Sequence, residues 1–131
     1  MEKLKINIVN GLMYTDIGAW NANKHKYCDM SVLVDTGAAI TTIPDSILKG
    51  LGCLTYNKTT KVRTASGIEE MREVIIPKIK LGNVELENIA VHSYHFPYKF
   101  DFDGILGMNV LREFNFSVDF DENIIELRNR L

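Results

Sequence analysis

The chain has 131 residues, enough for one domain with a single hydrophobic core. Hydrophobic residues make up 46% and charged residues 24%, which excludes disorder, collagen-like repeats and a disulfide-dense mini-scaffold. The formal net charge is -2, whereas nucleic-acid-binding domains usually carry a basic excess. We therefore expect one domain over residues 1–131 and no nucleic-acid partner.

The distribution of charge also bears on location. The longest stretch without Asp, Glu, Lys or Arg is residues 88–98, much shorter than the roughly 20 apolar residues of a membrane-spanning helix. Residues 1–11 lack the unbroken apolar run of a secretory signal. With only Cys28 and Cys53, we expect reduced thiols in a cytoplasmic protein without a membrane partner, although a disulfide between them stays open.

Short strand patterns dominate the chain. Leu4, Ile6 and Ile8 alternate with polar residues and predict a half-buried strand, followed by an Asn10-Gly11 turn and an irregular stretch to about His25. The elements expected after this stretch are strands over 30–34 and 40–43, a short helix over 44–50, strands over 59–64, 68–76, 77–81 and 84–91, an aromatic loop over 92–102, a strand over 104–107, a helix over 108–114, and a hairpin over 116–120 and 124–127. Many short strands with one or two short helices predict an all-β, barrel-like domain.

The most informative residue is Asp35, which directly follows the apolar run 30–34 on a turn tightened by Gly37. A carboxylate placed like this, beside a second one, suits two acids that share a proton: one activates water and the other polarises a carbonyl. The hydroxyl of Thr36 can hold the turn rigid, and Gly37 lets backbone approach closely. In a simpler interpretation, Asp35 caps local N–H groups and Gly37 supplies a positive φ.

With its context, this segment resembles the retropepsin-like aspartic proteases, which comprise the retroviral proteases and their cellular and bacterial relatives. The matching pieces are residues 33–38, 42–44 and the hairpin around Ser66-Gly67, followed by a glycine-bounded hydrophobic strand that leads into a helix at 103–111. The closing segments within 116–127 resemble the cellular and bacterial branch.

The resemblance implies a closed β-barrel with a flap hairpin, and an aspartic endopeptidase that uses no metal and no cofactor. Asp35 would be the catalytic residue, Thr36 would brace two active-site loops across a dimer, and Gly37 would present backbone to the substrate. The residues implied in substrate binding are Ala38, the flap residues Ala65, Ser66, Gly67 and Ile68, and Ile105.

This mechanism needs two aspartates, and the chain has one D-T-G, because Asp16 and Asp103 stand in other contexts. A two-lobed single chain would need more than twice this length. The second Asp35 must then come from a second copy in a symmetric homodimer. The polypeptide substrate would lie extended between flap and floor, as an added strand.

Some features depart from the retroviral pattern. Ala39-Ile40-Thr41 stands where acidic residues are usual, and Met108 stands in place of an arginine, which leaves open how the dimer is braced. The flap tip has one glycine, Gly67, and the resemblance does not extend to residues 1–29. That N-terminal segment is expected to supply a dimer strand or an autoinhibitory or processed segment.

Two other functional classes remain open. A retropepsin-fold module could bind peptide or dimerise without turnover, although the intact D-T-G favours an enzyme. An unrelated β-barrel with a chance D-T-G would leave Asp35 exposed and far from residues 104–107.

Several further side chains are candidates for a metal site or a binding site. His92 and His95, with His25 and Cys28, could suggest a metal, but we expect a surface histidine pair and no metal site. Trp20 is expected to anchor a loop. The aromatic residues Tyr94, Phe96, Tyr98, Phe100 and Phe102 are expected to cover the core, with the substrate groove as the alternative.

Overall fold

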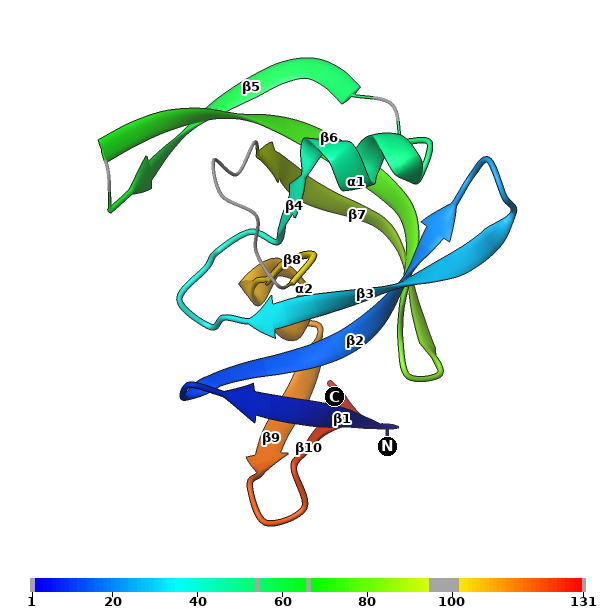
Figure 1. Ribbon diagram of the computed structural model, residues 1–131, viewed down its shortest axis with the longest axis vertical. Helices are drawn as coiled ribbons and strands as arrows, with labels where there is room; N and C mark the ends of the chain where they lie inside the picture. The colour runs from blue at the N-terminus through cyan, green and yellow to red at the C-terminus, as the bar shows by residue number, and fades with distance from the viewer. Residues whose placement is uncertain (1, 54, 66, 95–101, 131) are drawn as a thin grey trace.

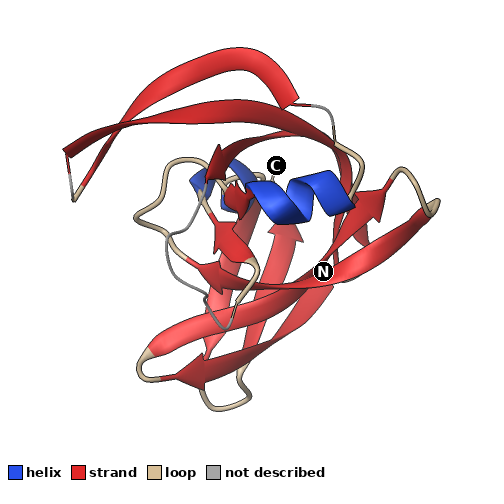
Figure 2. Cartoon of the chain, turned by 45° about the horizontal axis from the view of Figure 1, so that its top comes forward, coloured by secondary structure: helices blue, strands red, loops and turns tan. Residues whose placement is uncertain are grey.

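The computed structural model describes residues 2–53, 55–65, 67–94 and 102–130. Within them the chain forms ten strands and two short helices, so the predicted all-β class is confirmed (Figure 2). The strands are β1 (Glu2–Val9), β2 (Leu12–Asn21), β3 (Lys26–Val34), β4 (Thr42–Pro44), β5 (Thr55–Thr64), β6 (Gly67–Leu81), β7 (Val84–Tyr94), β8 (Gly104–Leu106), β9 (Phe114–Asp119) and β10 (Ile124–Asn129). The helices are α1 (Asp45–Gly50) and α2 (Met108–Leu111).

The strands pair in the order β5-β6-β7-β4-β8-β3-β2-β1-β10-β9. A further pairing joins β2 to β6, where Gly18 and Ala19 lie opposite Lys80 and Ile79. It closes β2, β3, β8, β4, β7 and β6 into a ring, with β5 added on one side and β1, β10 and β9 on the other (Figure 1). The six strands therefore form a closed ring of pairings within an all-β fold.

The stretch expected to be irregular before His25 is largely the strand β2. This strand pairs with β1 over residues 12–15, with β3 over residues 14–21, and with β6 at Gly18 and Ala19. Ile17, Gly18 and Ala19 are all buried, so the strand is covered on both faces there and shows no simple alternation. The prediction from periodicity was therefore wrong for these residues.

The two strands expected over 68–76 and 77–81 form one strand, β6. Pro77 cannot donate a backbone hydrogen bond, but the pairing with β7 skips Pro77 and Asn88. Asn88 adopts a φ of 53°, so the irregularity is absorbed by one residue on each strand. The second helix also differs, because it ends at Leu111 and the buried Phe114 already begins β9.

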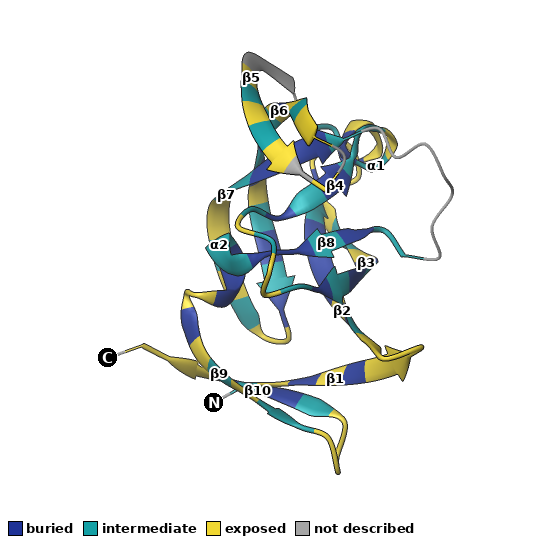
Figure 3. Ribbon diagram, turned by 90° about the vertical axis from the view of Figure 1, so that its left-hand side faces the viewer, coloured by how far each residue is buried: buried dark blue, intermediate teal, exposed yellow. Residues whose placement is uncertain are grey.

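One apolar core fills the ring and continues beneath β1, β9 and β10. Buried positions run along the ring strands, whereas exposed positions concentrate at hairpin ends (Figure 3). α1 closes one side of the core through Leu48, which has no exposed surface. Neither helix in the described part of the chain is long and apolar enough to cross a membrane.

Three connections lie on one side of the molecule: the β1–β2 turn, the loop after β3 that begins with Asp35, and the end of the β5–β6 hairpin (Figure 1). The β5–β6 hairpin projects beyond the ring on this side (Figures 1 and 2). The arrangement places a projecting hairpin and the Asp35 segment on the same side of the fold.

Candidate active site

The Asp35 loop, residues 35–38, follows β3 directly. Its first residue continues the strand pairing, because the Asp35 N–H donates to the Leu106 carbonyl at 3.0 Å. The Gly37 N–H donates to Oδ1 of Asp35 at 2.8 Å, and the Ala38 N–H donates to the Asp35 carbonyl at 3.2 Å. The half-buried carboxylate is thus oriented by its own loop.

The simpler interpretation of Asp35 is partly realised. Its side chain does accept a local N–H, but Gly37 is not among the described residues with positive φ. A Cβ at Gly37 would instead lie 3.1 Å from Oδ1 of Asp35, so glycine leaves room beside the carboxylate. The chance D-T-G hypothesis is wrong, because Asp35 is bonded to β8 rather than remote from it.

The short strand β8 lies between β3 and β4. It runs parallel to β3, with Leu33 opposite Ile105, and antiparallel to β4, with Ile105 opposite Thr42. Beyond β8, the Met108 N–H donates to the Ala38 carbonyl at 2.8 Å. The two sequence motifs, about 70 residues apart, therefore form one hydrogen-bonded unit.

Glycines bound β8 because the neighbouring backbone leaves no space for a side chain. A Cβ at Gly104 would lie 2.6 Å from the Ile43 side chain and 2.9 Å from the Thr42 carbonyl. A Cβ at Gly107 would lie within 2.9 Å of backbone atoms of Ala38, Ile40 and Thr41. Gly104 therefore lets β4 pack closely against the start of β8, and Gly107 lets the end of the Asp35 loop pack against the end of β8.

A side-chain network supports this unit, and sequence reasoning gave it no role. Oδ1 of Asn109 accepts from the N–H and the hydroxyl of Thr41, both at 2.8 Å, and its amide donates to the Ala90 carbonyl at 2.8 Å. The Thr41 hydroxyl also accepts from the Gly107 N–H at 3.0 Å. In the sequence these two residues were visible only as a threonine and an asparagine, each in or beside a motif.

The structural role of Asp103 was also not predicted from the sequence. Its carboxylate accepts from the Ser31 N–H at 2.9 Å, and its own N–H donates to the Ser31 carbonyl at 2.6 Å. This pair extends the contact between β3 and the segment that leads into β8. An aspartate directly before Gly104 was its only visible signal.

Side chains of β3, β8 and β4 that lie on the same face of the sheet form a row across these strands. Residues directly opposite each other in paired strands share a face. Register places Leu33, Ile105 and Thr42 side by side on β3, β8 and β4; we call these three residues the floor. Asp35 follows Leu33 by two positions, so strand alternation brings it to the same face.

The row continues beyond the floor. Thr42 lies opposite His92 on β7, and His92 lies opposite Glu73 on β6. His92 is 9% exposed, and burial lowers its pKa while the Glu73 charge acts in the opposite direction. A hydrogen bond to Glu69, with some burial, raises the pKa of Tyr94.

The other residues expected in substrate binding lie around the loop and at the hairpin. Ala38 is half-buried within the Asp35 loop, and Thr36 is exposed. Ala65 and Gly67 are exposed at the end of the β5–β6 hairpin, and Ile68 is 66% exposed. Ser66 lies outside the described residues.

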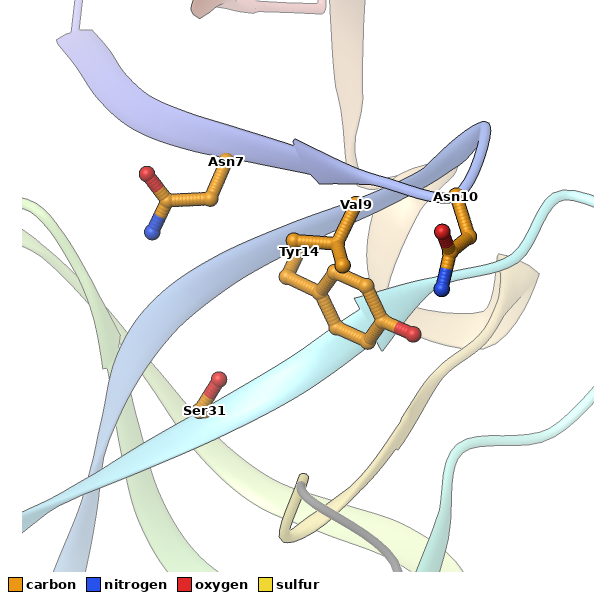
Figure 4. A pocket seen from close by; sticks show the side chains of 5 residues that line it. All are labelled: Asn7, Val9, Asn10, Tyr14 and Ser31. Atoms are coloured by element: carbon orange, nitrogen blue, oxygen red, sulfur yellow. The ribbon is translucent and has the colours of Figure 1, made fainter.

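A cavity of about 240 Å³ lies beside this region, between the β1–β2 hairpin and β3 (Figure 4). It is lined by Asn7, Val9, Asn10, Tyr14 and Ser31, and Tyr14 lies opposite Leu33 in the sheet. The Tyr14 ring contacts that of Phe102, with centroids 5.7 Å apart. The cavity adjoins the floor on the side of β2.

The other side chains considered as site candidates do not form a common site in the described part of the chain. No three His, Cys, Asp or Glu side chains in the described part of the chain gather as a metal site would require. Trp20 lies in β2 rather than in a loop, with the Tyr27 ring 5.3 Å away and the Lys78 ammonium 4.9 Å from its own ring. His95, Phe96, Tyr98 and Phe100 lie outside the described residues.

Comparison with known proteins agrees with this architecture. The family described as gag-polyprotein putative aspartyl protease matches residues 22–113. The fold is similar to a retropepsin-like aspartic protease from Rickettsia conorii, with a TM-score of 0.65 and 21% identity, covering 95% of this chain and 87% of that one. It is also similar to the retroviral protease-like domain of Ddi1 from Leishmania major, with a TM-score of 0.60 and 15% identity, covering 91% of this chain and 90% of that one.

No curated protein matches the chain in sequence. The family match nevertheless covers most of the chain, including the Asp35 loop and β8. The chain therefore belongs to the gag-polyprotein putative aspartyl protease family and has the fold of a retropepsin-like aspartic protease.

Proposed function

We propose that this chain is an aspartic endopeptidase that acts as a homodimer on polypeptides. Asp35 would be the catalytic residue, and each subunit would supply one carboxylate. The observation that carries the proposal is the half-buried Asp35 carboxylate, oriented by the Gly37 N–H on a loop bonded to β8.

The chemistry follows from two carboxylates that share one proton. One takes a proton from water as the water attacks the peptide carbonyl, and the other, which carries the shared proton, transfers it to the carbonyl oxygen. The product is a tetrahedral diol. Protonation of its nitrogen and cleavage of the C–N bond then give an acid and an amine, with no covalent intermediate.

A second copy is required because the chain carries only one D-T-G. The Asp35 loop lies on the side of the molecule where β3 ends, and Thr36 is exposed there. An exposed hydroxyl next to the carboxylate suits a brace between two copies around a two-fold axis. Gly37 and Ala38 would present loop backbone to the substrate.

The substrate would lie extended between the floor and the β5–β6 hairpin. An extended peptide satisfies its backbone groups by pairing with strand edges, and side-chain pockets then provide specificity. Ile105, on the floor, and the hairpin-end residues Ala65, Ser66, Gly67 and Ile68 would contact it.

The test compares the wild type with Asp35→Asn and with Asp16→Asn, which removes the charge of an exposed aspartate on β2. An unfolded protein serves as substrate from acidic to neutral pH, and sedimentation measures dimer formation. We expect cleavage to fall at least about 1,000-fold in Asp35→Asn, because the acid–base pair is lost, and to persist in Asp16→Asn.

Equal cleavage by wild type and Asp35→Asn would contradict the proposal. A stable dimer that cleaves none of a broad set of unfolded proteins would instead support a non-catalytic peptide-binding module.

A further inference from the structure

The β5–β6 hairpin has two faces that differ in burial. Alternate residues of β6 near the end of the hairpin separate into an exposed set and a more buried set. The exposed set is Ile68, Glu70 and Arg72, and the more buried set is Glu69, Met71 and Glu73. We call the faces that carry these sets the outer face and the inner face.

The register with β5 extends this separation across the hairpin. Lys61 and Arg63 lie opposite Glu70 and Ile68, and both are exposed on the outer face. Val62 and Thr60 lie opposite Glu69 and Met71 and are half-buried on the inner face.

The inner face is directed toward the row that contains the floor. Glu69 accepts a side-chain hydrogen bond from Tyr94 of β7. Glu73 lies opposite His92, which lies opposite Thr42 of the floor. A peptide between the hairpin and the floor would therefore meet Glu69 and Glu73, with Asp35 at the end of the same face.

Charge is sorted between the two faces as well. Within residues 59–63 and 67–73, Lys61, Arg63 and Arg72 all lie on the outer face, and the inner face carries only carboxylates as charged groups. Nearby, His92 is buried, and burial favours its neutral form. The charged side chains on the inner face within these residues, Glu69 and Glu73, are thus both carboxylates.

We propose that Glu69 is a specificity-determining residue that selects a Lys or Arg side chain in the polypeptide bound beneath the hairpin. The proposal rests on the proposed function and names the substrate class of that site. A half-buried carboxylate interacts with a cation in a lower effective dielectric than an exposed one does. Its two oxygens accept several hydrogen bonds, so a guanidinium or ammonium can bind while the Tyr94 hydroxyl holds the side chain in place.

The chain offers a matched pair of variants. Glu69→Gln removes the charge and keeps a carbonyl oxygen for the Tyr94 hydroxyl. Glu70→Gln removes the neighbouring charge from the outer face. Mass spectrometry of an unfolded protein digest first locates a cleaved sequence with an arginine, and a synthetic peptide is then paired with its citrulline analogue, which has the same shape without the charge.

We expect wild type and Glu70→Gln to cleave the arginine peptide about tenfold faster in kcat/KM than the citrulline peptide at low salt, with a smaller ratio at high salt. In Glu69→Gln we expect a ratio of about one to two. A ratio unchanged by Glu69→Gln, or changed equally by Glu70→Gln, would overturn the inference, and circular dichroism checks that each variant is folded.

A binding measurement separates this inference from the proposed chemistry. Fluorescence anisotropy records binding of a labelled arginine peptide and its citrulline analogue to Asp35→Asn and to the double variant Asp35→Asn with Glu69→Gln. A preference for arginine that disappears only in the double variant supports the role of Glu69 even if the wild type cleaves nothing. Equal binding of both peptides to Asp35→Asn overturns it, whatever the activity of the wild type.

Discussion

The unit around Asp35 and the β5–β6 hairpin face each other but are built differently. At the Asp35 unit, backbone meets backbone: Gly107 has no room for a Cβ, and the Asp35 N–H is bonded to β8. At the end of the hairpin, a Cβ added to Gly67 would meet no described atom within 4 Å, and Ile68 is 66% exposed.

The difference corresponds to two demands of the proposed reaction. Acid–base chemistry requires the carboxylate to stay within a fraction of an ångström of its working position, which a densely bonded support provides. A polypeptide must also enter and leave, which requires an element with few buried contacts that can open at low cost. The chain meets both demands by separating them in space.

The strongest test of this comparison is Gly107→Ala. The new Cβ would lie 2.8–2.9 Å from backbone atoms that hydrogen bonds keep in place, so the loop must shift. We expect a loss of at least about 3 kcal/mol in the free energy of unfolding, measured by urea denaturation, together with loss of cleavage. Gly67→Ala, at a φ of 121° in open space, should cost only about 1–2 kcal/mol of backbone strain. If the two variants lost equal free energy of unfolding, the proposed difference between the Asp35 unit and the hairpin would be wrong.

A smaller effect is expected from Asn109→Ala. It removes three hydrogen bonds and leaves the N–H of Thr41, which is 2% exposed, without its partner. We expect a loss of about 2–4 kcal/mol in urea denaturation. Asn115→Ala, on the exposed side of β9, is the control and should change stability by less than about 0.5 kcal/mol. If both variants behaved alike, the network would not support the Asp35 unit.

The smallest effect concerns His92, which lies between the floor and the hairpin. Burial lowers its pKa, so below the ordinary value of about 6.5 the unfolded chain binds a proton more readily than the folded one. Stability should therefore fall as the pH drops from 6.5 toward the lower folded pKa. We expect His92→Gln to reduce the fall in melting temperature between neutral and mildly acidic buffer. His25→Gln, at the exposed β2–β3 turn, should leave that slope unchanged, and identical slopes in all three proteins would exclude His92 as the cause.

The sequence predicted the parts of the site whose signals are local. The apolar run before Asp35 and the glycines around residues 105–106 mark short buried strands. It was the resemblance to the retropepsin-like proteases that implied that the two segments belong to one site. The Thr41–Asn109 bonds join residues 68 positions apart, and neither side chain carries a local signal for such a contact. The missed strand β2 has the same origin, because β6 covers it at Gly18 from about 60 residues further along the chain.

The position of β8 has a consequence for how the molecule is made. Its neighbours in the sheet, β3 and β4, both precede it by about 60 residues or more, so a chain emerging from the ribosome completes them while the place between them is still vacant. Until residues 104–106 arrive, the Asp35 N–H has no Leu106 carbonyl to bind, and the loop lacks its support. Long-range strand insertion is also slow, because the chain entropy is lost before the contacts form. The proposed active site is therefore assembled late. In an unfinished chain, Asp35 is present but lacks the β8 backbone that fixes the position of its loop.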